Sequence, residues 1–356
     1  MELINERLRK RFDERYEFRL AKQNDIPAIM EYIDTCWRKG HILGKNRELF
    51  EYEFCDGDDV HFLLAIDRKT GCIEGLDGYY YTSSRRTPKE FDVWGSMWSV
   101  RKDHKNLPLL GIAIANNYFE KVGFRYEIGV GVNAVTATPL HQEHFNVATG
   151  ILKHYYMLKR MPEYRIAKIV EPHYYEIDTQ QETYTLVQAD SIDQVNSRFD
   201  FENKITTYPY KDGWYVEHRF FEHPIYKYNV MLIMNSNDEA DAVMVLRNVE
   251  LLGHHVLRIV DYMGDIAALK KVKNQVYNLM DDTCEYIDFY CYGYDEKAIL
   301  NAGFTERKRE DENIIPSYFE PFEQKNVEYW FNSDAKDNFV ICKADADQDR
   351  PNIIIN

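Results

Sequence analysis

The sequence predicts an α/β protein made of two copies of one unit. Residues 91–100 form an apolar strand, residues 108–113 open a helix, and residues 126–132 are extended again. This order of elements returns in the second half of the chain. With 356 residues, the chain is long enough for two hydrophobic cores of ordinary size.

The elements before this segment complete the first copy. Residues 16–30 contain a short strand, a polar turn with Asn24 or Asp25 as the helix cap, and an amphipathic helix. Residues 60–66 and 73–81 are further strands. The first half therefore predicts strands interrupted by helices, as expected of an α/β unit.

The same plan returns from residue 183 onward. Residues 183–195 repeat the strand, cap and helix of residues 16–30, with Ile192 where Ile26 stood, just past the cap. The remaining elements keep their order: strands at 228–234, 242–247 and 257–262, a helix at 266–279, and a strand at 286–290. Because Pro162 and Pro172 interrupt any regular period, we expect a first domain at 1–160, a connector at 161–182 and a second domain at 183–356.

Composition excludes several classes of function. Lys and Arg total 44 against 59 Asp and Glu, a formal charge of -15, which disfavours nucleic acid or an anionic membrane as a partner. Six cysteines without a C-x-x-C pair argue against a zinc module or a disulfide framework, and we expect no metal. No run approaches eighteen apolar residues and the N-terminus has no apolar signal core, so we expect a cytoplasmic protein without a membrane span.

The helix that opens at residues 108–113 begins with small residues. A helix N-terminus carries unpaired backbone N–H groups and a partial positive charge, so a turn with Gly111 and Ala113 can hold a pyrophosphate. The alternative is a small residue placed where a helix packs closely on a strand. The pattern by itself does not decide between the two interpretations.

The order and spacing of these pieces resemble the acetyl-CoA site of the GNAT acetyltransferase superfamily. That family opens the helix with Arg/Gln-x-x-Gly-x-Gly/Ala, and the matching positions here are Pro108, Gly111 and Ala113, so two of three anchors are present. The resemblance implies two tandem GNAT-like units, each a mixed, strongly twisted sheet flanked by helices. It also implies acetyl-CoA, or another acyl-CoA, as cofactor.

The resemblance assigns the cofactor to the first unit. The strand edge that pairs with the pantetheine arm falls on residues 98–100, and Lys105 is the expected counter-charge of the pyrophosphate. Asn133 resembles an Asn that holds a backbone or cofactor amide. The full expected cofactor set is Trp98, Ser99, Val100, Lys105, Leu109, Leu110, Gly111, Ile112, Ala113 and Asn133.

Three residues are candidates for proton transfer. His141 stands where the family often has a Tyr that protonates the leaving thiolate, and His144 follows about one helical turn later. Two surface histidines on a short helix are the alternative. Glu127 and Asp92 lie on or near the central strands and are candidates for the general base, of which Glu127 is our choice.

The acceptor is expected beside the segment between the first helix and the second strand, which covers the acceptor in this superfamily. Its candidate contacts are Trp37, Arg38, His41, Phe50 and Tyr52.

The second unit has lost the cofactor turn, because Asp265 stands where a pyrophosphate would lie. We expect it to be degenerate, with a structural or acceptor-binding role. Asp261, Asp288, Arg219 and His223 are acceptor-cleft candidates, or else members of core salt bridges. The polar run at 345–352 is either a solvated tail or an Arg350 held by carboxylates beside a ligand cleft.

Residues 150–157 and 315–321 resemble segments of GNAT-like proteins in bacterial surface-polysaccharide pathways. The resemblance implies an N-acyltransferase that moves an acetyl or similar group to the amine of an amino sugar or a nucleotide-activated sugar. Two alternatives stay open. One is a non-catalytic GNAT-like binding protein, favoured by Pro108 and His141, and the other is a FemX-like aminoacyl transferase, which the acidic charge counts against.

Overall fold

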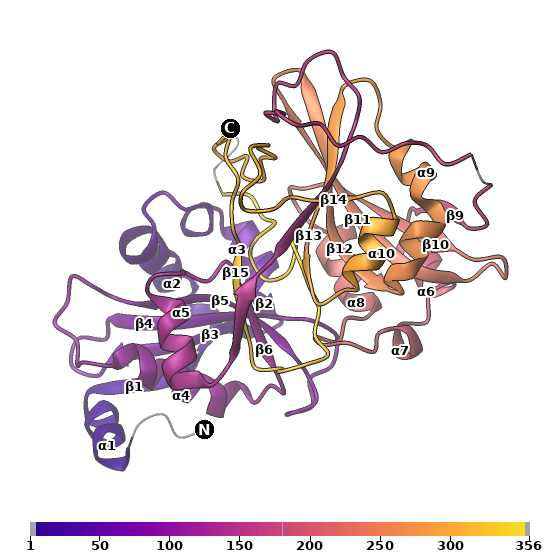
Figure 1. Cartoon of the computed structure of the whole chain (residues 1–356). Helices are drawn as coiled ribbons and strands as arrows, with labels where there is room; N and C mark the ends of the chain where they lie inside the picture. Colours follow the sequence, from indigo (N-terminus) through magenta and orange to yellow (C-terminus); the bar gives the residue numbers. More distant parts are fainter. Residues whose placement is uncertain (1–4, 180, 353–356) are drawn as a thin grey trace. The chain divides into compact units, whose positions relative to one another are not determined.

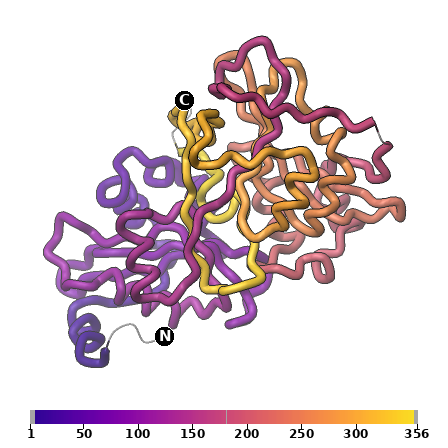
Figure 2. The backbone as a smooth tube through the Cα atoms, viewed as in Figure 1, coloured from indigo at the N-terminus to yellow at the C-terminus, as the bar shows by residue number. Residues whose placement is uncertain are grey.

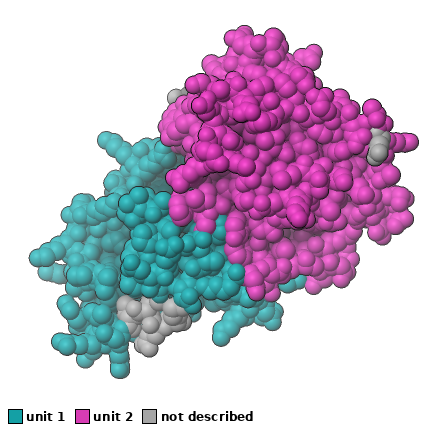
Figure 3. Space-filling model, in the orientation of Figure 1, with its two compact units in different colours: residues 1–149, 331–336, 351–356 teal, residues 150–330, 337–350 magenta. Residues whose placement is uncertain are grey.

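The structure, a computed structural model, describes residues 5–179 and 181–352 and divides into two compact units (Figure 3). Unit 1 comprises Met1–Thr149, Phe331–Lys336 and Pro351–Asn356, and unit 2 comprises Gly150–Trp330 and Asp337–Arg350. Each unit is built on an eight-stranded sheet with helices packed against it (Figure 1). No helix in the described part of the chain is long and apolar enough to span a membrane.

The sheet of unit 1 has the order β1-β3-β4-β5-β6-β15-β7, with β2 paired to β3. The pairs from β1 to β5 are antiparallel, β5 and β6 are parallel, and β15 is antiparallel to β6. The strands are β1 (Tyr16–Lys22), β2 (Cys55–Asp56), β3 (Asp59–Asp67), β4 (Ile73–Tyr81), β5 (Val93–Val100), β6 (Glu127–Val130), β7 (Ala148–Ile151) and β15 (Trp330–Ser333).

The helices of unit 1 cover this sheet. The longest, α4 (Leu110–Val122), buries the side chains of Leu110, Ile112 and Ile114 in a core that also holds Phe12 and Val93. The others are α1 (Glu6–Arg15), η1 (Gln23–Asp25), α2 (Ile26–Tyr32) with its continuation η2 (Ile33–Trp37), η3 (Ile42–Gly44), α3 (Arg47–Phe54), and α5 (Ala137–Leu140) with its continuation η4 (His141–Phe145).

The sheet of unit 2 has the order β14-β8-β13-β12-β11-β10-β9, with β16 paired to β13. Its strands are β8 (Lys153–Leu158), β9 (Thr185–Ala189), β10 (Tyr228–Met234), β11 (Ala240–Leu251), β12 (His254–Gly264), β13 (Cys284–Tyr292), β14 (Thr305–Glu306) and β16 (Ile341–Cys342). Its helices are α6 (Ile192–Asn196), α7 (Phe201–Lys204), α8 (Gly213–Val216), η5 (Glu217–Phe221), η6 (Ile266–Val272), α9 (Lys273–Tyr277) and α10 (Glu296–Asn301).

The duplicated plan is confirmed. Each sheet runs through antiparallel strands to a parallel pair, β5 with β6 in unit 1 and β12 with β13 in unit 2. In both units a short strand from elsewhere in the chain then follows the pair, namely β15 in unit 1 and β8 in unit 2. The two units therefore share one α/β topology, as the order of elements predicted.

The two sheets exchange these strands, which the sequence did not reveal. We assigned residues 150–157 to the end of the first unit, but β8 pairs with β13 in the sheet of unit 2. Its place in unit 1 is taken by β15, which pairs Phe331 with Val130 and Ser333 with Ile128. The late part of the chain thus enters both units, as the yellow end of the tube shows in Figure 2. A strand pattern predicts a strand but not the sheet that it joins.

The expected connector at 161–182 is packed rather than free. Ile166 and Ala167 are buried beside β8 and β13. The backbone N–H groups of residues 165–167 donate to the carboxylate of Glu285, at 2.6 to 2.9 Å. A buried carboxylate needs such donors, so residues 165–167 of this segment belong to the unit 2 core.

Candidate functional site

The parallel strands of unit 1 separate after three paired positions. Val93, Trp94 and Gly95 of β5 pair with residues 127–129 of β6, and the pairing ends there. In the described chain, β5 continues to Val100 with partners only on the β4 side, where a register shift falls between Asp77 and Tyr79. The freed edge of β5 presents backbone N–H and C=O groups to which an extended amide chain can bind.

The turn after β5 leads into a helix start without a side-chain cap. Leu109, the residue before α4, has φ 66 and ψ 19, and no side chain caps the helix. Leu109 is also 54% exposed, so a bulky apolar residue adopts a left-handed conformation on the surface, which costs about 1 kcal/mol. The N–H of Leu110 donates to the Leu107 carbonyl at 3.3 Å, which leaves the N–H groups of Gly111 and Ile112 in the first turn of α4 to bind an anion.

Trp98 ties this turn to the sheet. Its Nε1 donates to the carbonyl of Gly111 at 3.1 Å, and its ring lies 3.4 Å from where a Cβ on Gly111 would be. Ser99 points to the other face, where its hydroxyl and that of Tyr32 are 3.2 Å apart. Val100 lies beside Trp98, 3.6 Å from the same Cβ position.

The other expected cofactor residues lie partly in the core and partly on the surface. Leu110, Ile112 and Ala113 are buried in the core, so only their backbone can reach a ligand. Lys105 is exposed in the preceding loop, where its carbonyl accepts from Arg15 at 2.8 Å. Asn133 caps the turn before α5, and its side-chain oxygen accepts from the N–H groups of residues 135 and 136 at 3.0 and 2.9 Å.

Glu127 pairs with Val93 at the first of the three paired positions, and its side chain reaches along the strands to Gly95, the last paired residue of β5. Its carboxylate occupies the space that a Cβ on Gly95 would need. Burial raises the pKa of Glu127 well above the ordinary value, and the nearby carboxylates of Asp77 and Asp334 raise it further. A glutamate with a raised pKa is a stronger base than an exposed one, which suits the removal of a proton from an amine.

Three residues that sequence reasoning missed surround Glu127. Asp77 on β4 is buried, and Asp334 follows β15 and donates its backbone N–H to the Glu127 carbonyl at 3.0 Å. Burial raises the pKa of both carboxyls, that of Asp334 to about 6. Tyr118 on α4 is 1% exposed, and its hydroxyl has no hydrogen-bond partner among the described residues. An acid inside the apolar strand 73–81 could have marked Asp77 as a candidate site residue. Nothing in the sequence linked Asp334 to Glu127.

His141 and His144 differ in their surroundings. His141 packs against Trp98 and Phe145, with ring centroids 5.5 and 5.2 Å apart. Burial lowers the pKa of His141 to about 4, so its imidazole is neutral at pH 7, and its Nδ1 is buried without a partner in the described chain. His144 is exposed. His141 can therefore offer a hydrogen bond at neutral pH, but it does not carry the extra proton of an imidazolium.

Comparison with known proteins supports the fold. No protein-family model and no curated protein matches the sequence. Among solved structures, a GCN5-related N-acetyltransferase from Anabaena variabilis ATCC 29413 matches with a TM-score of 0.55 at 10% identity, over 89% of this chain and 72% of that chain. The chain has a tandem GNAT fold.

Two further structures resemble the chain more weakly. A probable N-acyltransferase from Enterococcus faecalis V583 matches with a TM-score of 0.49 at 8% identity, over 89% of this chain and 72% of that chain. A Saccharomyces cerevisiae N-myristoyltransferase with bound myristoyl-CoA has a TM-score of 0.45 at 10% identity, over 96% and 84%.

The second GNAT-like unit fills its own strand opening. β12 and β13 pair up to Ile259 and Phe289 and then separate. β16 enters there, pairing Cys342 with Cys291, and the N–H of Ala344 donates to the Val260 carbonyl at 2.7 Å. In unit 2 the chain's own backbone thus occupies the strand edges between β12 and β13. The corresponding edge of β5 in unit 1 is unpaired in the described chain.

The polar residues expected at an acceptor cleft in unit 2 belong instead to its interior. Lys211, 3% exposed, holds Asp261 and Asp345 at 2.8 and 2.7 Å. Asp288, also buried, pairs with Arg258 at 2.9 Å, and the buried His223 accepts from the N–H groups of Ile225 and Tyr226. Arg219 is partly buried and donates to the carbonyls of Ala344 and Asp349. Because Asp345, Asp349 and Arg350 are buried, residues 345–350 are not a solvated tail.

The expected acceptor residues of unit 1 divide into surface and core. Trp37 and Arg38 are exposed, with the Trp37 ring 4.9 Å from that of His41. His41 is buried and accepts from the N–H of Leu43 through Nδ1. Phe50 is fully buried, stacked on Phe62, and Tyr52 is partly buried. Only Trp37, Arg38 and Tyr52 present surface to a ligand.

Proposed function

We propose that the chain is an acyl-CoA-dependent N-acyltransferase whose first unit binds the donor. The proposal rests on three features that unit 1 combines: a freed β5 edge, an α4 start without a side-chain cap, and a glutamate whose carboxylate lies beside Gly95, the last paired residue of β5. The GNAT fold supports the same interpretation. Unit 2 lacks these features, because β16 fills its opening and Asp265 precedes η6.

The residues present fit such a donor. The N–H groups at the start of α4 would hold its phosphates, and residues 96–100 of β5 would pair with its amide-containing arm. Acyl-CoA supplies an activated acyl thioester to an attacking amine. Of the acids in the preceding loop and on β4, Asp103 is paired with Arg101 and Glu74 with His104.

The side chains of unit 1 supply the proton chemistry. Glu127 would take the proton from the acceptor ammonium, leaving the neutral amine that attacks a thioester. The ring contacts of Trp98 with His141 and Phe145 would shield this side of the site from water. Trp98 also fixes the carbonyl of Gly111, and thereby the direction of the turn.

We extend the proposal to acetyl as the acyl group and to the amine of an amino sugar, free or nucleotide-activated, as the acceptor in surface-polysaccharide biosynthesis. Support for this finer assignment comes from the sequence resemblance of residues 150–157 and 315–321. The exposed aromatic surface of Trp37 suits the apolar face of a sugar ring. Release of the CoA thiol in the presence of amino sugars and their nucleotide derivatives tests the acceptor.

The first test is calorimetric titration of acetyl-CoA, and then of longer acyl-CoA thioesters, into the purified full chain. Gly111→Glu places bulk and negative charge at the first turn of α4, and Lys121→Glu places the same side chain at its last turn as a matched control. We expect binding by the wild type and by Lys121→Glu, and none by Gly111→Glu. Failure of the wild type to bind any acyl-CoA, or equal binding by Gly111→Glu, refutes the proposal.

A further inference from the structure

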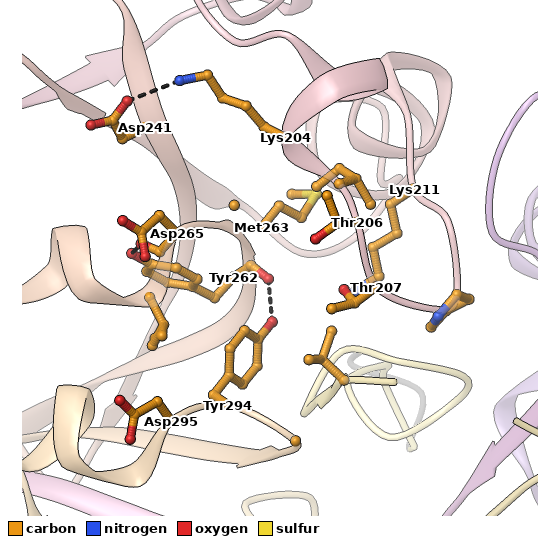
Figure 4. A pocket seen from close by; sticks show the side chains of 16 residues that line it. Lys204, Thr206, Thr207, Lys211, Asp241, Tyr262, Met263, Asp265, Tyr294 and Asp295 are labelled. Carbon is orange, nitrogen blue, oxygen red and sulfur yellow. Dashed lines mark hydrogen bonds and ion pairs between the residues drawn. The ribbon is translucent and has the colours of Figure 1, made fainter. Parts of the chain in front are cut away.

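A cavity of about 520 Å³ opens in unit 2 where β12 and β13 end (Figure 4). Its walls come from the ends of these strands, from the end of α7 and the loop after it, from β11, and from the residue before β16. Residues 262–266 and 293–295 supply the first wall and residues 204–211 the second, while Asp241 of β11 and Val340, which leads into β16, complete the lining. All of these residues lie within unit 2.

The cavity occupies the place in unit 2 that corresponds to the donor turn in unit 1, but it is closed along the strands. β16 fills the space between β12 and β13, so an extended arm cannot enter there. What remains is a compact volume within the range of about 300–1,000 Å³ usual for small-molecule sites. The filled opening therefore selects a short ligand instead of a long thioester.

The two lysines of the cavity are already neutralised. Lys204 is paired with Asp241 at 2.9 Å, and Lys211 with Asp261 and Asp345 at 2.8 and 2.7 Å. Leaving a paired carboxylate for a ligand anion would uncover a negative charge in a partly or fully buried place, which is costly. A phosphate or a carboxylate is consequently a poor ligand for this cavity.

Two aspartates have acceptor capacity left. Asp265 and Asp295 are exposed, and each uses one carboxylate oxygen to accept a backbone N–H, from Ala267 and Lys297, at 2.9 Å. The second oxygen of each has no partner among the described residues. These oxygens accept hydrogen bonds from hydroxyl or ammonium groups, and their charge favours a cation.

Hydroxyl groups and aromatic rings complete the lining. Thr206 and Thr207 lie across the cavity from Asp265 and Asp295, and the rings of Tyr262 and Tyr294 lie between the two sides (Figure 4). The Tyr294 hydroxyl donates to the Tyr262 carbonyl at 2.5 Å, which holds this wall together. Threonine hydroxyls both donate and accept. Tyr262 is 1% exposed, so the ring available to pack on C–H surfaces is that of the partly exposed Tyr294, and the lining matches a ring that carries several hydroxyls.

We propose that this cavity binds a monosaccharide-sized polyol that carries an amine. The ligand class follows from the filled opening, the paired lysines, and the aspartates and threonines that face each other. It does not rest on acyl transfer by unit 1, although the acceptor proposed there belongs to the same chemical class.

The test is titration of D-glucosamine into the full chain without any acyl-CoA, followed by calorimetry or by ligand-observed NMR, with D-glucose and D-glucose 6-phosphate as neutral and anionic probes. Asp265→Asn and Asp295→Asn remove the charges, and asparagine caps a turn as well as aspartate does. Asp282→Asn, an exposed change outside the cavity, is the matched control. We expect glucosamine to bind, glucose to bind more weakly and glucose 6-phosphate not to bind.

Binding of glucosamine should weaken at least tenfold in Asp265→Asn and Asp295→Asn and stay unchanged in Asp282→Asn. The proposal is overturned if glucosamine does not bind the wild type, if glucose 6-phosphate binds as well, or if both cavity variants bind like the wild type. Because the titration contains no donor, failure here leaves acyl-CoA binding by unit 1 standing, and failure of the Gly111→Glu test leaves this site standing.

Discussion

Glu127 is the residue on which the proposed chemistry depends. It is partly buried, its carboxylate fills the space above Gly95, and burial together with Asp77 and Asp334 raises its pKa. A carboxyl with a raised pKa is protonated at low pH and becomes a base only as the pH rises through that pKa. The rate of acyl transfer should therefore rise with pH, and this rising limb of the pH–rate profile should follow the deprotonation of Glu127.

Glu127→Gln removes the base while keeping the size of the side chain. We expect kcat to fall by about 10²–10⁴-fold and the pH limb to vanish, with acetyl-CoA affinity unchanged. Thiol release measured from pH 5 to 9, beside calorimetry, checks this. An unchanged pH profile in the variant would show that another group takes the proton.

Asp77→Asn removes a negative charge near Glu127 but leaves the amide shape. Since the Asp77 charge is one cause of the raised Glu127 pKa, the pH limb should move to lower pH. The same rate measurements, repeated on Asp77→Asn, check the direction. A limb that stays in place or moves to higher pH would contradict the coupling of these carboxylates.

At the scale of elements, the close approach of β5 and β6 explains a glycine. A Cβ on Gly95 would need the space of the Glu127 carboxylate, which is the flexible end of a side chain and can move. Gly95→Ala should therefore fold yet displace the base, and lower kcat by roughly 10²-fold. Gly213→Ala, which would displace the amide of Asn196 in unit 2 in the same way, is the matched control. Similar activity losses in both variants would argue against the assigned role of Glu127.

The segment that carries β16 is held in unit 2 by a buried charge cluster. Lys211→Met would leave Asp261 and Asp345 without their cation, at a cost of about 3–5 kcal/mol in the free energy of unfolding. Asp345→Asn added to this variant should restore part of the loss, because it removes one uncompensated charge. Urea unfolding followed by tyrosine and tryptophan fluorescence checks both variants. A Lys211→Met protein as stable as the wild type would show that the cluster does not hold the segment.

At the scale of the whole molecule, the sequence predicted what depends on local patterns. Apolar runs and caps located β5, α4, β6 and their counterparts in unit 2, and an acid in a central strand pointed to Glu127. The predicted helix at 266–279 is broken into η6 and α9, because Val272 adopts ψ 20 between them. The sequence therefore predicted that helical residues lie here, but not that the helix is interrupted.

Long-range pairing could not be predicted. β15 has four residues and β16 has two, too short for a reliable alternation, and their partners are fixed by tertiary structure. The exchange of β8 and β15 between the sheets, the filling of the unit 2 opening and the approach of Asp334 to Glu127 all follow from these pairings. Lining residues of the unit 2 cavity were missed for the same reason, since they come from five separate segments.

The position of β15 has a consequence for biosynthesis. β15 lies between β6 and β7, so the sheet of unit 1 lacks an internal strand until a segment about 200 residues beyond β6 has been translated. At ordinary elongation rates this takes roughly 10–40 s. During that time the nascent first unit exposes an unpaired edge of β6 on the ribosome, while all of β8 to β14 is made. A chaperone that shields that edge, or slow pairing in its absence, would then set the yield of active protein in the cell.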